Sequence, residues 1–184
     1  GTEEFDALYK KYEADKSVPK KSIPAQDLFF DLLKERAETG RIYIMNLDHC
    51  NSHSSFKDKV SMSNLCQEIT LPTTPIQHVD DEEGEIALCI LSAVNVGGLN
   101  DLSELENICD LSVRALEQII DYQDYPVRAA EVSTKKRRSL GIGYIGLAHY
   151  LAKNNVKYSD PKAWELVDRL TEAFQYNLLR ASCN

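Results

Sequence analysis

An almost continuous apolar run, from Ile86 to Val94, limits the possible folds of this chain more than any other feature. A run of this length without a polar face is typical of a strand that is buried on both sides. Segment 41–47 is also rich in β-forming residues and is predicted as a second, short strand. Helical patterns and long polar loops separate and follow these two segments. This order favours an α/β architecture with parallel strands.

Helical periodicity marks the longer segments of the chain. It covers about 24–39, about 101–121, about 137–153, and a segment that starts at Asp160-Pro161 and continues to the last residues. Residues 1–21 are polar and lysine-rich and are predicted to form a flexible lead segment, so that 22–184 would be one partial domain. Two strands cannot close a sheet, and the last helix has no stop signal before Asn184. Both features predict a piece of a larger α/β domain.

Composition excludes several classes of function. The formal net charge is -8, and an acidic chain is a poor candidate for binding nucleic acid or anionic membranes. No apolar run approaches the ~20 residues of a membrane helix, and no signal-peptide pattern is present. The 5 cysteines are odd in number and widely spaced. Reduced thiols in a cytoplasmic protein fit this pattern better than a secreted disulfide scaffold.

Three polar side chains alternate at Asn64, Cys66 and Glu68. The segment 63–71 is predicted to be extended, and residues two apart in an extended backbone point to the same side. An amide, a thiol and a carboxylate would then line up as a site for a sugar with vicinal hydroxyls. The amide can hold hydroxyls, the carboxylate can take a proton, and the thiol can supply a sulfur nucleophile or radical. From spacing alone, an edge strand with one buried cysteine is the favoured alternative.

Further motifs favour a functional site over an edge strand. Ser63-Asn64-Leu65-Cys66 with Glu68-Ile69 resembles the finger loop of class I (Ia-like) ribonucleotide reductase large subunits. Other segments resemble the same family in the same order, namely 39–44, 46–51, 84–89, 113–116, 121–126 and 137–143. The resemblance runs from about residue 22 to the end of the chain. Two departures are a shorter stretch between Cys50 and Asn64, and Met62 at a place where a polar residue is more usual.

The resemblance implies part of a ten-stranded α/β barrel, incomplete in this chain, with a catalytic finger loop over about 61–70. It also implies an enzyme that reduces ribonucleoside diphosphates to 2′-deoxyribonucleoside diphosphates by a thiyl-radical mechanism. Cys66 would become the radical that abstracts the 3′ hydrogen. Glu68 would exchange a proton with the 3′ hydroxyl, and Asn64 would hydrogen-bond the sugar hydroxyls. Leu65 and Gln67 would contact the substrate beside them.

Cys89 would be one of the two thiols that reduce the 2′ position and end as a disulfide, with its partner thiol outside this chain. The family also implies a metal-containing small subunit that supplies the radical, thioredoxin or glutaredoxin as reductant, and allosteric nucleotides bound outside this segment. No metal or cofactor is expected in the chain itself. The remaining segments of the large subunit, in the same or a second chain, would be required. The chain alone is therefore expected to be inactive.

Three other patterns suggest competing sites. Gly141 to Gly146 fits G-x-G-x-x-G, but the basic run 135–138 precedes it instead of a strand, so a helix with closely packed glycines is favoured. The basic run could contact phosphate or nucleic acid, but it is interpreted as a solvated face or turn. His49, Cys50 and His53 are zinc-ligand types without a second pair nearby. The alternatives in function are an inactive truncated fragment, an adenosylcobalamin-dependent reductase, or a small zinc- or nucleotide-binding module.

Overall fold

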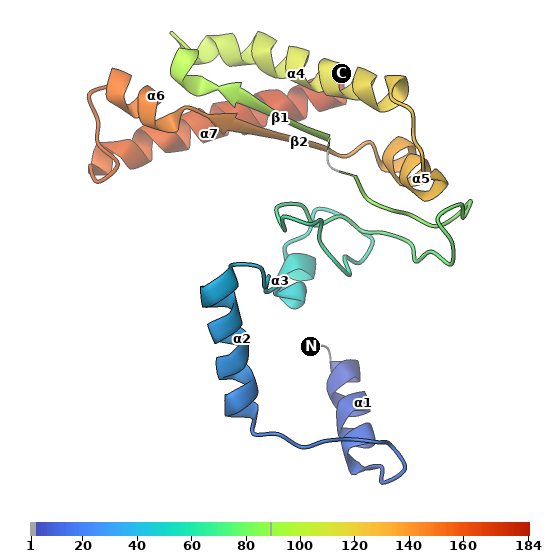
Figure 1. Cartoon of the computed structure of the whole chain (residues 1–184). Helices are drawn as coiled ribbons and strands as arrows, with labels where there is room; N and C mark the ends of the chain where they lie inside the picture. Colours follow the sequence, from blue (N-terminus) through green and yellow to red (C-terminus); the bar gives the residue numbers. More distant parts are fainter. Residues whose placement is uncertain (1–2, 89) are drawn as a thin grey trace. The chain divides into compact units, whose positions relative to one another are not determined.

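The computed structural model describes residues 3–88 and 90–184, and the chain divides into two compact units. One unit ends at Pro72 and the other runs from Thr73 to Asn184. Figure 1 shows that the first carries helices and loops and the second carries the sheet. The division predicted from the sequence, after residue 21, stays a prediction. No helix among the described residues is both long and apolar enough to cross a membrane.

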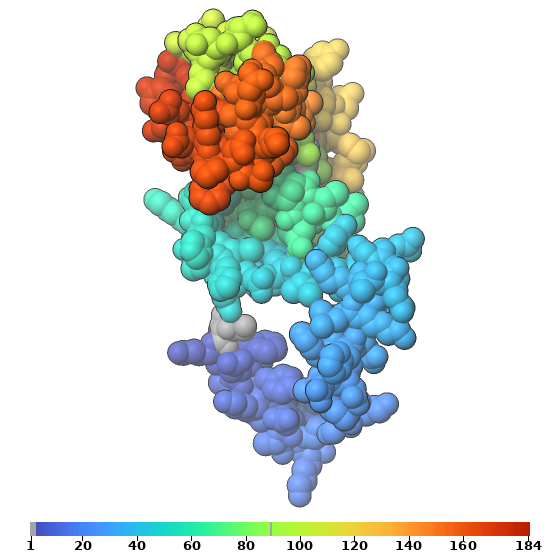
Figure 2. All heavy atoms as spheres, turned by 90° about the vertical axis from the view of Figure 1, so that its left-hand side faces the viewer, coloured from blue at the N-terminus to red at the C-terminus, as the bar shows by residue number. Residues whose placement is uncertain are grey.

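The first unit has three helices among its described residues: α1 (Glu3–Ala14), α2 (Ala25–Thr39) and α3 (Leu47–Ser52). The predicted helix over 24–39 is confirmed by α2, which ends where Gly40 takes the left-handed conformation at φ 65° and donates its N–H to Arg36 O. None of the three helices has a buried residue. In the space-filling view the blue helices have few other atoms around them, whereas the orange and red residues pack closely (Figure 2).

Residues 3–14 form a helix within the lead segment, whose flexibility stays a prediction. One prediction for the first unit is wrong. Residues 41–46 form no strand, and α3 starts at Leu47. Tyr43 and Ile44 are exposed, and this unit contains no described strand with which segment 41–47 could pair. β-propensity measures the fit to a paired, half-buried surface, so it does not create a strand without a partner.

The second unit is built on two parallel strands, β1 (Ile90–Asn95) and β2 (Leu140–Ile145), paired from Ile90↔Leu140 to Asn95↔Ile145. Helices α4 (Leu105–Tyr122) and α5 (Arg128–Arg137) connect the two strands, and α6 (Leu147–Lys153) and α7 (Pro161–Cys183) follow β2. The predicted helices over 101–121 and from 160 onward are confirmed by α4 and α7. The α/β class with parallel strands is therefore confirmed, as a small open sheet. The ten-stranded barrel stays a prediction.

The core of this unit lies where α4 and α7 pack together against the sheet (Figure 1). Its largest buried cluster joins β1, the turn after it, α4 and α7, through Val94, Val96, Leu99, Leu105, Cys109, Leu170 and Phe174. The ring of Phe174 meets Tyr144 of β2 edge-on, with centroids 5.5 Å apart. The opposite face of β1 is uncovered, because Leu91 and Ala93 are exposed. The prediction that this strand is buried on both sides is therefore wrong for this chain.

The glycine-rich segment is a strand and not the predicted continuous helix over 137–153. Gly141 and Gly143 lie within β2, and Gly146 lies between β2 and α6 with φ 81°. A Cβ at Gly146 would overlap Oδ1 of Asn95 and lie 3.1 Å from the backbone nitrogen of Gly97. Glycine is required there by both the positive φ and the close approach of the turn after β1. Gly146 thus allows the chain after β2 to pack closely against the turn after β1.

Candidate active site

The loop with the predicted catalytic residues is a closed turn held by Asn64. The Asn64 N–H donates to Ile69 O at 3.2 Å, and the Ile69 N–H donates to Asn64 Oδ1 at 3.0 Å. The Asn64 carbonyl accepts from the Gln67 N–H at 3.2 Å and from the Ser63 hydroxyl at 3.0 Å. One asparagine therefore joins both ends of the loop and fixes its width.

This geometry corrects the extended conformation predicted for segment 63–71. Residues 65–68 form turns and bends, and Gln67 has a φ of 66°. Asn64, Cys66 and Glu68 therefore do not alternate along a strand, although one small loop carries all three. The reason is local, because an asparagine side chain can accept a nearby backbone N–H and replace the pairing that a strand would need.

The tip of the loop points outward. The Leu65 side chain is 86% exposed, and Cys66 and Glu68 are exposed as well. The Cys66 thiol is free and accessible at the end of a closed turn. Such a thiol can meet a ligand or partner surface without rearrangement of the loop.

A second asparagine anchors the chain before the loop. The Asn51 side chain donates to Leu47 O at 3.0 Å and to Val60 O at 2.9 Å, and its Oδ1 accepts the Val60 N–H at 2.8 Å. Val60 is fully buried. The carboxamide therefore pairs with both backbone groups of Val60, as a strand neighbour would. Sequence reasoning missed this role, and the only signal was the position of Asn51 at the end of the family-like segment 46–51.

The remaining cysteines have different surroundings. Cys89, the predicted reducing thiol, lies outside the described residues, so its geometry relative to Cys66 stays a prediction. Cys109 is buried in the core of the second unit, and burial raises the pKa of its thiol while the charge of Arg180 opposes that rise. Cys50 is half-buried and Cys183 is exposed.

No group of three or more His, Cys, Asp or Glu side chains within residues 3–88 and 90–184 is arranged to hold a metal ion. His49 and Cys50 lie in α3, and His53 follows it. Nδ1 of His53 lies 2.9 Å from the Ser52 hydroxyl and 3.1 Å from His49 O. Hydrogen bonding at the end of a short helix accounts for His53.

The basic run 135–138 covers the end of α5 and the residue after it, and it is only partly solvated. Lys135 is exposed and pairs with Glu131 at 2.9 Å. Arg138 adopts φ 47° and holds Glu117 and Asp121 of α4, the latter at 2.9 Å. These hydrogen bonds and charges lower the pKa of the Asp121 carboxyl. Arg137 is also largely buried, with its side chain 14% exposed, so the two arginines serve ion pairs within the fold.

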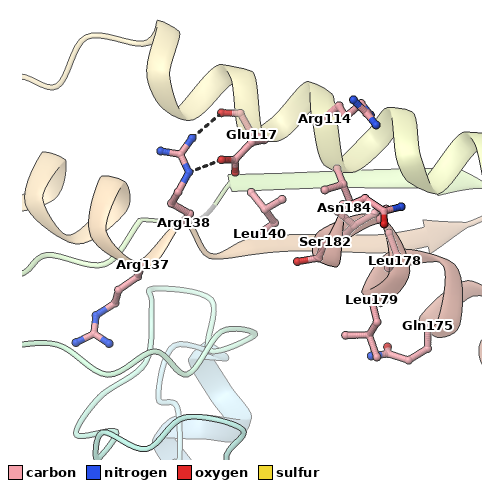
Figure 3. A pocket seen from close by; sticks show the side chains of 13 residues that line it. Arg114, Glu117, Arg137, Arg138, Leu140, Gln175, Leu178, Leu179, Ser182 and Asn184 are labelled. Atoms are coloured by element: carbon pink, nitrogen blue, oxygen red, sulfur yellow. Dashed lines mark hydrogen bonds and ion pairs between the residues drawn. The ribbon is translucent and has the colours of Figure 1, made fainter.

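A cavity of about 680 Å³ lies in the second unit between α4, β2 and the end of α7. Figure 3 shows Leu140, Leu178 and Asn184 around it, with Arg138 turned toward Glu117 at one side and Arg137 pointing away. None of the predicted catalytic residues lines it. The site predicted from the sequence is therefore the loop alone.

A closed, asparagine-braced cysteine loop and a small open sheet of two parallel strands place the described part of the chain in the α/β class. The model of the ribonucleotide reductase barrel domain matches residues 1–184, and the chain belongs to that family. Ribonucleoside-diphosphate reductase subunit alpha of Buchnera aphidicola subsp. Schizaphis graminum is 56% identical over 182 residues, which cover 97% of this chain and 24% of that relative.

Other relatives agree. Ribonucleoside-diphosphate reductase 1 subunit alpha of Escherichia coli (strain K12) is 54% identical over 183 residues, covering 98% of this chain and 24% of that protein. The chain thus spans about a quarter of the length of the curated relatives it matches. Among solved structures, the class Id ribonucleotide reductase alpha subunit of Actinobacillus ureae has a TM-score of 0.65 and 24% identity, covering 96% of this chain and 33% of that one. At that identity the likeness supports the fold.

Proposed function

We propose that this chain supplies the radical-loop part of the catalytic core of a ribonucleoside-diphosphate reductase. One observation supports this above the others. A loop that presents Cys66 at an exposed, braced tip lies in a chain that aligns along nearly its whole length with subunits of that name. Because the chain spans a quarter of those relatives, other segments would complete the pocket.

The proposed reaction converts a ribonucleoside diphosphate to its 2′-deoxy product. The Cys66 sulfur radical takes the 3′ hydrogen atom, which leaves a carbon radical on the sugar. The 2′ hydroxyl then leaves as water, and two thiols supply two electrons and two protons as they form a disulfide. Cys89 is one of these thiols, and the other lies outside this chain. Return of a hydrogen atom to the 3′ carbon regenerates the Cys66 radical.

The polar groups of the loop have distinct tasks in the proposed reaction. Glu68 carries the carboxylate that exchanges a proton with the 3′ hydroxyl. Oδ1 of Asn64 already accepts the Ile69 N–H. The same side chain would therefore hold the loop closed and hydrogen-bond the sugar hydroxyls at the same time. The loop width and the substrate contact therefore depend on one side chain. Leu65 and Gln67 complete the substrate contacts.

A thiyl radical must be shielded from water and from stray hydrogen donors, and an exposed tip provides no shield. Segments beyond this chain would enclose Leu65 and Cys66 when the substrate binds, which gives the exposed Leu65 an apolar surface to contact. The metal-containing small subunit would supply the radical, and thioredoxin or glutaredoxin would reduce the disulfide. Allosteric nucleotides would bind outside this segment.

The test is a turnover assay with matched components. The large subunit from the complete reading frame, its small subunit and a thioredoxin system are mixed with a ribonucleoside diphosphate, and the deoxy product is measured. We expect product from the complete system and none from this chain alone, which should bind the diphosphate only weakly. Absence of product from the complete system would contradict the proposed function and favour an inactive fragment.

A further inference from the structure

A fully buried carboxylate, that of Glu85, lies shortly before β1. Its side chain has no exposed surface, and both oxygens have partners. Oε1 accepts from Arg137 Nε at 3.0 Å, and Oε2 accepts from an amino group of the same guanidinium at 2.8 Å. Lys136 Nζ lies 3.3 Å from Oε1. A bidentate, buried arginine pair of this kind holds its partners in one geometry.

The same carboxylate joins two segments of the chain that lie eleven residues apart. Oε2 accepts the Thr74 N–H at 2.8 Å and the Thr74 hydroxyl at 3.0 Å, and the Glu85 N–H donates to Thr74 O at 3.0 Å. Gly84 lies so close to Ile76 that a Cβ there would overlap the Ile76 side chain. Residues 74–85 therefore form a loop that is closed at its base by Glu85.

Helix α5 holds this closed loop at several places. The Ile86 N–H donates to Ala129 O at 3.1 Å, and the Ala129 N–H donates to Val79 O at 3.1 Å. Ala129 is fully buried, and Arg137 reaches Glu85 from the opposite end of the helix. The loop and the approach to β1 are thus fixed to one rigid element. All of these residues belong to the second unit.

The carboxylate has the properties of an anchor and not of an acid or base. Burial alone would raise the pKa of Glu85, but the hydrogen bonds from Arg137, Thr74 and Lys136 outweigh burial and lower it to about 2. The group therefore stays charged at neutral pH and has no proton to transfer. The exposed pair between Arg128 and Glu82 in the same region has a glutamate side chain that is 79% exposed, and it offers a natural contrast.

We propose that Glu85 is a positioning residue for the segment that leads to Cys89, the reducing thiol of the proposed reaction. Ile86 precedes Cys89 by three residues. Holding Thr74 and Ile86 against α5 fixes the chain directly before that thiol. A small error in the relative position of reacting groups has a large effect on rate. This role rests on the proposed function, and it is carried by a residue that contacts neither substrate nor radical.

The test compares Glu85→Gln with Glu82→Gln in the holoenzyme formed by the full-length large subunit and its small subunit. Glu85→Gln keeps the shape of the side chain and removes the charge. We expect kcat to fall on the order of 10- to 100-fold, while KM for the diphosphate changes by less than about threefold. The exposed Glu82→Gln should leave both parameters within about twofold of the wild type. If the substitution only destabilised the fold, the amount of folded enzyme would fall. The kcat calculated per folded enzyme would then stay at the wild-type value.

A milder variant serves if Glu85→Gln does not fold. Thr74→Val removes only the hydroxyl that donates to Oε2 and keeps the backbone N–H, and we expect kcat to fall about threefold at unchanged KM. Folded Glu85→Gln with the kcat of Glu82→Gln, or folded Thr74→Val with wild-type kcat, would overturn the positioning role. Wild-type holoenzyme that makes no product would instead contradict the proposed function, so the two failures are distinguishable.

Discussion

The contacts of Glu85 with Thr74 and Arg137, together with the hydrogen bond from Ile86 to Ala129, form what we call the Glu85 clamp. Acid should open this clamp before it disturbs the rest of the fold. The carboxylate accepts the Thr74 N–H directly, and its protonation removes the charge on which the bidentate contact with Arg137 depends. The backbone amides of Thr74, Glu85 and Ile86 are hydrogen-bonded within the clamp. Their exchange with solvent therefore reports its opening.

The size and sign of the effect follow from the pKa. The pKa of Glu85 falls from an ordinary value of 4.5 to about 2 in the folded state, which corresponds to about 3 kcal/mol of stabilisation. Because the folded value is the lower one, this contribution is complete well above pH 4.5 and is lost as pH falls from there toward 2. At pH 3 the expected loss is about 2 kcal/mol, or about a 30-fold drop in the protection of these amides.

Native-state hydrogen exchange at pH 6 and pH 3, corrected for intrinsic exchange rates, measures this drop. The Val60 N–H is the internal control, because it donates to the neutral carboxamide of Asn51 and should keep its protection. Glu85→Gln should have low protection at Thr74 at both pH values, with no dependence on pH. Thr74 protection that is equal at pH 6 and pH 3 in the wild type would refute the clamp. So would a wild-type pH dependence that Glu85→Gln shares.

Two substitutions and one control test the packing of the second unit in urea unfolding. Gly146→Ala should lower the free energy of unfolding by at least about 2 kcal/mol, because the φ of this residue is positive and the new Cβ would overlap Asn95. A loss near zero would show that the turn after β1 can move aside without cost. Leu105→Ala, in the α4 core, should cost about 2–5 kcal/mol. Leu111→Ala on the exposed face of the same helix should cost less than about 0.5 kcal/mol, and equal losses from the two leucines would contradict the packing described here.

Helices were the part of the fold that the sequence predicted best. The segments that became α2, α4 and α7 combine long apolar periodicity with clear ends, such as Gly40 after α2 and Asp160-Pro161 before α7. These signals are local, so they do not depend on what the rest of the chain does. The family was also predicted correctly, because several motifs occurred in one order.

Features that depend on distant partners were predicted poorly. Segment 41–47 has β-forming residues but no strand to pair with, whereas β2 carries two glycines yet forms a strand because β1 lies beside it. The contact between Glu85 and Arg137 joins residues 52 positions apart, and no local sequence pattern predicts it. In the candidate site, the motif predicted which residues the loop carries. Its closed shape depends on hydrogen bonds from the side chain and backbone of Asn64 and was missed.

Substitution of Cys66 tests the central claim most directly. The full-length large subunit with Cys66→Ser is assayed with its small subunit, a thioredoxin system and a ribonucleoside diphosphate, beside a Cys183→Ser control. Both thiols are exposed, but only Cys66 lies in the loop. Serine cannot supply a sulfur radical, so we expect no deoxy product from Cys66→Ser and wild-type turnover from Cys183→Ser. Deoxy product from folded Cys66→Ser at the wild-type rate would contradict the assignment of the radical to this loop.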